Sequence, residues 1–317
     1  MPIPSDLVSD LRPLGRTGIS VSPLTLGTSG MGSGVEPGSQ AERDAVELAT
    51  AMLHGPAAVV DTSNVYGGGN SERILGLALR ESGIAPGRQI VTKVDADPET
   101  GVFDRDRVLR SYDESLARLG VDRVSLLHLH DPYRIDFAEA MGPQGAVAGL
   151  LELRASGAVD AIGIAAGKVS VVGRYVESDC FDVLLTHNRF TLVERRATVL
   201  LEAARQREMG VFNAAPFGGS LLARGSASGG TYAYRPAPPE LVERVRQLER
   251  ICASHGIDLA TAALQFSLRS PLVDSTVVGI SRPERIADLE QRRAVQVPDE
   301  FWDAIDDLGV PPSVVED

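Results

Sequence analysis

Short apolar runs alternate along the chain with segments in which apolar residues recur at helical spacing. In one such segment Ala45, Leu48, Ala49 and Met52 follow an i, i+3, i+4, i+7 pattern, which predicts an amphipathic helix. Strands that alternate with helices indicate a parallel sheet. The apolar runs predict strands at Leu24–Gly27, Ala57–Asp61, Gln89–Lys93, Val124–His130, Ala161–Ala165, Val183–His187, Val211–Ala214 and Thr276–Val278.

Eight strands with helices between them, within 317 residues, favour a single α/β domain over residues 1–317. We expect it to close into a (β/α)8 TIM barrel, with an open doubly wound sheet as the alternative. Ahead of the first strand, Leu11–Ser22 contains Gly15 and Gly18 and predicts an N-terminal β-hairpin that would cover one end of the barrel. Further helices are predicted at Ser71–Arg80, around Leu109, Tyr112, Leu116 and Leu119, and at Val147–Ala155, Val169–Glu177, Glu194–Arg207, Pro239–Ser254 and Leu259–Leu268.

The charge balance restricts the classes of partner. The chain has 31 basic and 43 acidic side chains and a net charge of −12, so we expect neither a nucleic-acid nor a membrane partner. Cys180 and Cys252 lack any CxxC or zinc-ligand spacing, which predicts free thiols in a reducing compartment and no metal site. Residues Met1–Asp10 lack the basic and apolar parts of a signal peptide, so we predict a cytoplasmic protein. The sequence leaves the oligomeric state open between a monomer and a homo-oligomer.

Four residues capable of acid–base chemistry follow the ends of three consecutive predicted strands. Asp61 ends the second strand, Tyr66 lies in the loop after it, Lys93 ends the third strand and His130 ends the fourth. In a barrel the C-terminal strand ends meet at one rim, where active sites of this architecture are built. Each residue alone is commonly a cap, a solvated charge or a packing residue. Their shared position predicts an active site.

The motifs around these residues resemble the aldo-keto reductase signature. They are the run Asp61–Glu72, the pair Thr92–Lys93 and the run His130–Pro132, and the similarity extends from Leu14–Gly18 to Val278–Arg285. The resemblance implies an NAD(P)-dependent oxidoreductase with a small-molecule substrate, and a catalytic tetrad of Asp61, Tyr66, Lys93 and His130.

In the tetrad implied by this resemblance, Tyr66 is the general acid in reduction and the general base in oxidation. His130 donates a hydrogen bond to the substrate oxygen. A free tyrosine titrates near 10, and we expect Lys93 to lower that pKa while Asp61 balances the lysine charge. A second histidine, His128, lies on the same side of the predicted strand, one layer deeper. We expect it to be buried and hydrogen-bonded.

No G-x-G-x-x-G motif follows a predicted strand, so a Rossmann site is absent. The resemblance implies instead that NADP or NAD lies across the barrel mouth, with Arg285 as the ligand of a 2′-phosphate. Ala165, Ala166, His187 and Ala214 stand where relatives commonly carry other nicotinamide contacts, which leaves the choice between NAD and NADP open. The implied cofactor-binding residues are Gly27, Thr28, Asp61, His187, Ala215, Pro216, Phe217, Gly218, Gly279, Ser281 and Arg285.

Three runs, His130–Pro132, Asn188–Leu192 and Asn213–Pro216, resemble the sugar-dehydrogenase branch of the family, which includes L-fucose, D-threo-aldose and L-galactose dehydrogenases. Asp95 stands where many aldehyde reductases carry a tryptophan, and a carboxylate there suits sugar hydroxyls. We therefore expect Tyr66, Asp95 and His130 to contact substrate. The expected reactions are oxidation of an aldose at C1 to a lactone or reduction of a small aldehyde, with a pyridoxal-type substrate as a further candidate.

Two other functions are compatible with these residues. A barrel lyase would use Lys93 as a Schiff-base amine. A cofactor-binding regulatory subunit, like the potassium-channel β subunits of the same family, would show little turnover. The complete tetrad favours an enzyme.

Overall fold

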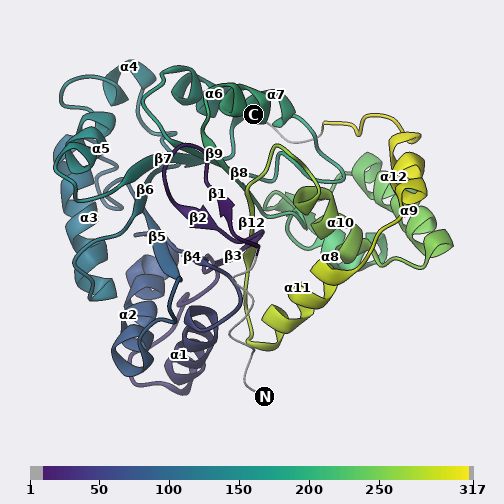
Figure 1. The fold of residues 1–317 in the computed structure, drawn as a ribbon, viewed down its shortest axis with the longest axis horizontal. Helices are drawn as coiled ribbons and strands as arrows, with labels where there is room; N and C mark the ends of the chain where they lie inside the picture. Colours follow the sequence, from purple (N-terminus) through teal and green to yellow (C-terminus); the bar gives the residue numbers. More distant parts are fainter. Residues whose placement is uncertain (1–9, 314–317) are drawn as a thin grey trace.

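The computed structural model describes residues 10–313, and its centre is a closed barrel of eight parallel strands (Figure 1). This confirms the predicted (β/α)8 fold. Residues 1–9, on which the inference about a signal peptide rests, lie outside the described residues. The barrel strands are β3 (Leu24–Gly27), β4 (Val59–Asp61), β5 (Gln89–Val94), β6 (Leu126–His130), β7 (Ala161–Ala166), β8 (Val183–His187), β9 (Gly210–Ala214) and β12 (Ser275–Gly279).

Barrel closure places the first and last strands side by side. Strand β12 pairs with β3 on one edge and with β9 on the other. In this register Gly279 lies opposite Gly27, and Val277 lies opposite Ala214. Strands β3 and β12, which are more than two hundred residues apart in the sequence, therefore meet at the same rim.

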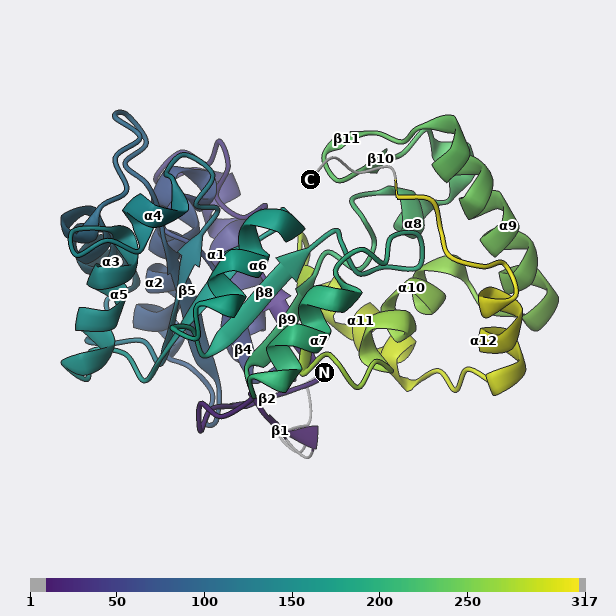
Figure 2. The ribbon, with the colours of Figure 1, turned by 90° about the horizontal axis from the view of Figure 1, so that it is seen from above.

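The predicted N-terminal hairpin is present and consists of β1 (Arg12–Pro13) and β2 (Ser20–Val21). Leu14 and Val21 are fully buried and belong to the same apolar cluster as inward-facing side chains such as Val59 and Phe212. The hairpin thus closes the N-terminal end of the barrel. Figure 2 shows it at the end opposite to α4 (Phe137–Ala140) and to the hairpin of β10 (Thr231–Tyr232) and β11 (Arg235–Pro236).

Helices surround the barrel, and amphipathic ones such as α3 bury one apolar stripe against it, whereas α10 is buried along most of its length. Helix α3 begins after Asp104, whose carboxylate accepts from the Arg107 backbone N–H, and it ends at Gly120 in the left-handed conformation. The surrounding helices are α1 (Gln40–Leu53), α2 (Asn70–Ser82), α3 (Arg105–Leu119), α5 (Ala146–Ala155), α6 (Val169–Glu177), α7 (Thr198–Gln206), α10 (Leu259–Leu268) and α11 (Glu284–Ala294).

A few elements differ from the prediction. Helix α7 begins at Thr198 and not at Glu194, because the Thr191 and Glu194 backbones bond to each other in a turn. The sequence patterns did not predict α11 or α12 (Asp299–Asp306); α12 packs with α9 (Pro239–His255) at one side of the barrel (Figure 2). The short elements η2 (Tyr66–Gly69), α8 (Leu221–Arg224) and η3 (Ser226–Ser228) lie in loops.

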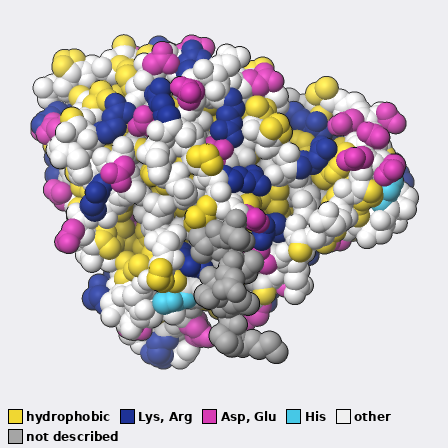
Figure 3. Space-filling view, in the orientation of Figure 1, with side chains coloured by type: hydrophobic (Ala, Val, Ile, Leu, Met, Phe, Trp, Pro, Cys, Tyr) yellow, Lys and Arg dark blue, Asp and Glu magenta, His cyan; other side chains and the backbone are white. Residues whose placement is uncertain are grey.

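On the face that carries the N-terminal hairpin, acidic and basic side chains are interspersed, so the excess of acidic residues forms no single-sign field there (Figure 3). Within residues 10–313, no helix combines the length and the apolar character that a membrane crossing requires.

Candidate active site

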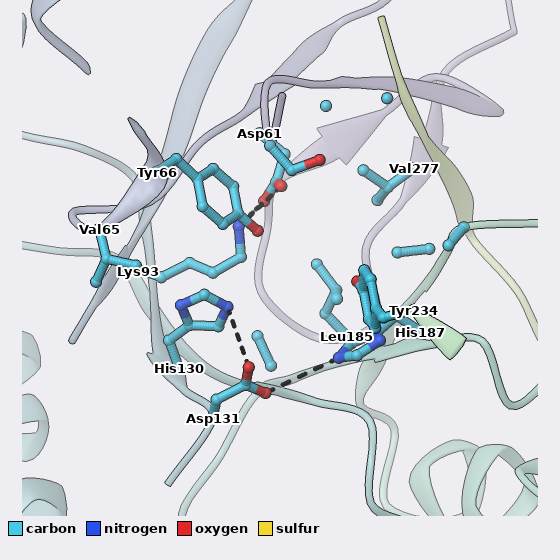
Figure 4. A pocket seen from close by; sticks show the side chains of 16 residues that line it. Asp61, Val65, Tyr66, Lys93, His130, Asp131, Leu185, His187, Tyr234 and Val277 are labelled. Carbon is cyan, nitrogen blue, oxygen red and sulfur yellow. Dashed lines mark hydrogen bonds and ion pairs between the residues drawn. The ribbon is translucent and has the colours of Figure 1, made fainter. Parts of the chain in front are cut away.

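A cavity of about 320 Å³ opens at the C-terminal rim of the barrel, and all four residues of the predicted tetrad line it (Figure 4). Across the cavity, the polar side chains of Tyr66, Lys93 and His130 face Leu185 and Val277. The cavity therefore has one wall able to transfer protons and, opposite it, an apolar surface that lies beside His187 and Tyr234. The remaining lining residues are Gly27, Ser29, Asp61, Val65, Asp131, Ala165, His187, Ala214, Ala215, Tyr234 and Gly279.

Lys93 is held by a dense set of acceptors at the base of the polar wall. Its Nζ donates to both carboxylate oxygens of Asp61 at 2.8 Å and to the Thr62 carbonyl at 2.6 Å, and the side chain is 1% exposed. Burial opposes the positive charge, but the attraction of Asp61 and Tyr66 raises the pKa of Lys93 above its usual value. Lys93 is therefore an ammonium group that donates.

Tyr66 reaches this ammonium because of the glycines that follow it. The Nζ of Lys93 lies 4.7 Å from the centre of the Tyr66 ring. Gly67 has a φ of +59°, and a Cβ there would lie 2.8 Å from the Gly32 backbone, so only glycine fits this turn. The short helix η2 therefore holds the ring over Lys93.

The acidity of Tyr66 differs from the sequence-based expectation. Burial raises the pKa of Tyr66 to about 12, and the opposing attraction of Lys93 offsets this only in part. Lys93 lowers this pKa, as expected, but burial of the phenol raises the pKa by more than Lys93 lowers it, and the sequence did not indicate this burial. At neutral pH Tyr66 is a hydrogen-bond donor.

His130 is paired with a carboxylate. Its Nδ1 lies 2.7 Å from Oδ1 of Asp95, whose Oδ2 accepts from the Ser63 hydroxyl at 2.5 Å. Asp95 was expected to contact substrate directly; in the structure one of its oxygens is engaged by His130 and the other by Ser63. On the other side of His130, Nε2 lies 3.9 Å from Asp131, which in turn lies 3.9 Å from Nε2 of His187 (Figure 4).

His128 lies one layer deeper than His130, as expected, and is fully buried. The expectation that it is hydrogen-bonded is wrong, because neither ring nitrogen has a partner within the described residues. Its ring instead packs edge-on against Phe212 and over Gly163, where a Cβ would lie 2.2 Å from Nδ1. Burial lowers the pKa of His128 well below 6.5, so the ring is neutral.

The residues expected to bind the cofactor are only partly brought to this cavity. Gly27, Asp61, His187, Ala215 and Gly279 line it. Thr28 does not, because its hydroxyl is buried and donates to the Asp61 carbonyl at 3.0 Å. The others lie outside the lining, in the loop after β9 or at the start of α11: Pro216, Phe217, Gly218, Ser281 and Arg285.

Several lining residues were not among the predicted contacts. Leu185 and Val277 lie two positions before His187 and Gly279 on the same strands, so their side chains point to the same side of the sheet. This alternation could have identified them as lining residues. Tyr234 had no such signal. It comes from the β10–β11 turn, is 82% exposed, and its ring lies edge-on to His187 at 6.1 Å.

A second space, the outer cavity, adjoins the first one and measures about 380 Å³. The two cavities share Val65, His130 and Asp131 and therefore adjoin at these residues. The rest of the outer cavity is lined by Asp95, Ala96, Asp97, Pro98, Phe103, Tyr133 and Arg134. It combines carboxylates, a guanidinium and two aromatic rings.

Known proteins with the same architecture were found by sequence and by structure. Residues 23–309 match the aldo/keto reductase family. The chain is 31% identical to pyridoxal 4-dehydrogenase of Microbacterium luteolum, over 95% of this chain and 98% of that protein. It is 31% identical to L-galactose dehydrogenase of Arabidopsis thaliana, over 88% and 86%, and 37% identical to D-threo-aldose 1-dehydrogenase of a Pseudomonas species, over 63% and 61%.

Among solved structures, a holo-form aldo-keto reductase from Bacillus halodurans matches with a TM-score of 0.76 at 20% identity, covering 97% of this chain and 98% of the other. This likeness shows the shared barrel, and the match over residues 23–309 shows the shared sequence pattern. The chain therefore belongs to the aldo/keto reductase family and is an NAD(P)-dependent oxidoreductase.

Proposed function

We propose that this enzyme oxidises the C1 hydroxyl of an aldose to a lactone, with reduction of a small aldehyde as the alternative reaction. The observation that carries the proposal is the outer cavity, which opens directly from His130 and is lined by Asp95, Asp97, Asp131 and Arg134. A polar lining of this kind offers hydrogen bonds to several hydroxyl groups of one substrate. Two relatives are named as dehydrogenases of aldoses, which supports the same class.

A pyridoxal-type aldehyde or alcohol is the second candidate. One specific observation favours it, namely that Phe103 and Tyr133 also line the outer cavity and offer faces to a flat ring. The relative matched over 95% of this chain is named pyridoxal 4-dehydrogenase.

The residues present fit a nicotinamide. In the cavity at the tetrad, the inner cavity, Ala165, Leu185, Ala214 and Val277 form an apolar surface suited to a flat ring. Gly27 and Gly279 have no side chains and leave the rim open beside this surface. When bound, NAD(P) supplies the hydride acceptor or donor for the reaction. In our proposal Gly27, His187, Ala215 and Gly279 hold this ring, together with the residues of the loop after β9.

The roles of the polar wall follow from its hydrogen bonds. Tyr66 and His130 lie edge-to-face, with ring centres 5.7 Å apart, so one substrate oxygen can contact both of them. The Lys93–Asp61 pair keeps a positive charge below Tyr66 without a net charge in the buried site. Lys93 does not act as a Schiff-base amine in this proposal, because its Nζ is a protonated donor to three oxygens.

We propose that the enzyme uses both NADP and NAD, with a modest preference for NADP. Arg285 is half-buried near the start of α11, and within residues 10–313 it has no carboxylate partner. A guanidinium pairs well with a phosphate. Ser281 and Arg282, both exposed, are close in the same loop. A single accessible arginine gives a moderate gain in affinity for NADP and does not exclude NAD.

The test is a panel of aldoses, pyridoxal and short aldehydes with NAD and with NADP, followed at the nicotinamide absorbance. We expect turnover with one or more aldoses and formation of a lactone. Tight cofactor binding with no turnover on any substrate would instead support a regulatory subunit. Turnover confined to pyridoxal would favour the second candidate.

A further inference from the structure

A further cavity, which we call the side cavity, measures about 330 Å³ and lies between helix α6 and the segment that joins β6 to α4. Phe137, the first residue of α4, packs edge-on against Tyr175 of α6 with ring centres 4.9 Å apart, so the two helices meet at this cavity. Its walls are mostly apolar or aromatic and include Ile135 and Val171. The volume is within the range of about 300–1,000 Å³ that small-molecule sites occupy.

Tyr175 contributes a buried hydroxyl to this cavity. The residue is 1% exposed and packs edge-on against two phenylalanine rings. Burial raises the pKa of Tyr175 to about 12, and the charges of Arg174 and Asp136 also act on it. Both of these residues line the side cavity, so the hydroxyl lies on the cavity side of the ring. Among residues 10–313 it has no hydrogen-bond partner. A buried hydroxyl normally has one, so this donor is available to an acceptor on a ligand.

Arg174 supplies a positive charge beside this hydroxyl. The side chain is exposed, and its guanidinium lies 4.2 Å from the centre of the Phe137 ring. Within the described part of the chain Arg174 makes no ion pair and donates no hydrogen bond from its side chain. A guanidinium that lies over an aromatic ring keeps N–H groups that can bind both oxygens of a carboxylate. The side cavity therefore offers an unpaired cation and an unpaired donor next to each other.

The charges around the side cavity favour an anionic ligand over a cationic one. Nζ of Lys168 lies 5.2 Å from the centre of the Tyr133 ring, so the Tyr133 and Phe137 rings each already carry a cation. The acidic lining residue, Asp136, is the N-cap of α4, and its Oδ1 accepts from the Ala138 N–H at 2.7 Å. An incoming cation would be repelled by both basic side chains, whereas an anion would be attracted by them.

The wall formed by Tyr133 is held in place by the backbone at the start of α6. Its hydroxyl accepts from the Gly167 N–H at 2.6 Å and from the Lys168 N–H at 3.1 Å. Tyr133 also lines the outer cavity, and it is the one lining residue that the two spaces share. No residue that lines the side cavity lines the inner cavity. The side cavity is therefore next to the substrate space but separate from the tetrad.

We propose that the side cavity is a second small-molecule site, which binds a flat ring that carries a carboxylate. The carboxylate pairs with the guanidinium of Arg174 and accepts the hydrogen bond of the Tyr175 hydroxyl. The ring lies against the apolar side chains of Ile135 and Val171. This site does not depend on which substrate the tetrad oxidises or reduces.

The first test needs neither cofactor nor substrate. Isothermal titration calorimetry of the purified protein measures the binding of benzoate and of the larger 2-naphthoate, with benzamide as the neutral molecule of the same shape as benzoate. We expect saturable binding of at least one carboxylate at one site, and binding of benzamide about ten-fold weaker than that of benzoate or less, because the amide lacks the charge. If neither carboxylate binds saturably, or if benzamide binds as tightly as benzoate, the proposal is overturned.

The second test locates the bound carboxylate. Arg174→Gln should weaken its binding about ten-fold or more, and Tyr175→Phe about two- to ten-fold. Arg110→Gln, which changes an exposed arginine on α3, is the matched control and should bind the carboxylate as wild type does. Arg134→Gln removes a guanidinium that lines the outer cavity and should have little effect. A loss of binding in Arg134→Gln without a loss in Arg174→Gln would place the ligand in the outer cavity and overturn the proposal.

A third measurement repeats the titration in the presence of saturating NADP. The affinity for the carboxylate should stay the same, because no residue of the side cavity lines the inner cavity. Direct competition with NADP would instead place the carboxylate in the inner cavity and overturn the proposal. Arg174 is exposed, so Arg174→Gln should keep the thermal midpoint of the wild type, and a loss of binding then reports on the site and not on folding.

Discussion

The ammonium group of Lys93 lies 4.7 Å from the centre of the Tyr66 ring, yet the pKa of Tyr66 is raised to about 12. Burial of the phenol outweighs the neighbouring charge, part of which is already neutralised by Asp61 at 2.8 Å. Tyr66 is therefore suited to stabilise a substrate oxygen by donation.

Tyr66→Phe should lower kcat by about 10²–10⁴-fold and leave the dissociation constant of the cofactor nearly unchanged. The reason is that the ring stays while the only donor on η2 that faces the cavity is removed. Steady-state kinetics and fluorescence titration of NADP measure the two effects. Tyr112→Phe, whose hydroxyl donates to the Ala158 carbonyl away from the cavity, is the control. A wild-type kcat in Tyr66→Phe at every pH would exclude the assigned role.

Lys93→Met should destabilise the protein by about 3–5 kcal/mol, because it leaves the buried Asp61 carboxylate without its partner. The pair is 1% and 6% exposed, so water does not compensate. The double variant Asp61→Asn with Lys93→Met should recover most of this loss. Urea denaturation of both variants measures it. Equal stability of the single variant and the wild type would show that the pair is not desolvated in solution.

His128→Leu should be as stable as wild type at pH 7.5 and more stable at pH 5. His128 is neutral in the folded protein, with its pKa well below 6.5, whereas an unfolded histidine takes up a proton near 6.5. The wild type therefore loses stability as pH falls below about 6.5, by up to ~1.4 kcal/mol per pH unit, and the variant avoids this loss. Denaturation curves at pH 7.5, 6 and 5 test it, and parallel pH dependences would contradict it.

Gly163→Ala should cost about 1–3 kcal/mol, since the new Cβ would lie 2.2 Å from Nδ1 of His128. In a His128→Ala background the same substitution should cost clearly less, because the ring that it meets is gone. Thermal denaturation of the wild type, the two single variants and the double variant gives the coupling free energy between positions 163 and 128. Additive effects would mean that the two residues do not touch.

Arg285→Ala should raise the dissociation constant of NADP by about ten-fold and hardly change that of NAD. The expectation follows from the loss of an accessible guanidinium that has no carboxylate partner within the described residues. Arg282→Ala, an exposed cation in the same loop, should have a smaller effect. Titration of both cofactors by fluorescence quenching measures these constants. A parallel loss for NAD and NADP would remove Arg285 from recognition of the 2′-phosphate.

The sequence alone predicted the barrel and the tetrad. Strand and helix periodicity are local properties, so they placed β3 to β9 and β12 almost correctly. They missed α11 and α12 and misplaced the start of α7. The tetrad was predictable because Asp61, Lys93 and His130 end consecutive strands, and parallel strand ends meet at one rim.

Only the tertiary structure decided what these residues do to one another. The pKa of Tyr66 depends on burial by the surrounding loops, and the Asp95–His130 bond joins the end of β6 to the loop after β5. Among the described residues His128 has no hydrogen-bond partner, because Phe212 and Gly163 pack against its ring. Desolvation and hydrogen bonding act between atoms that are near in space and distant along the chain. Sequence spacing therefore identified the groups, and the packing around them set their protonation states.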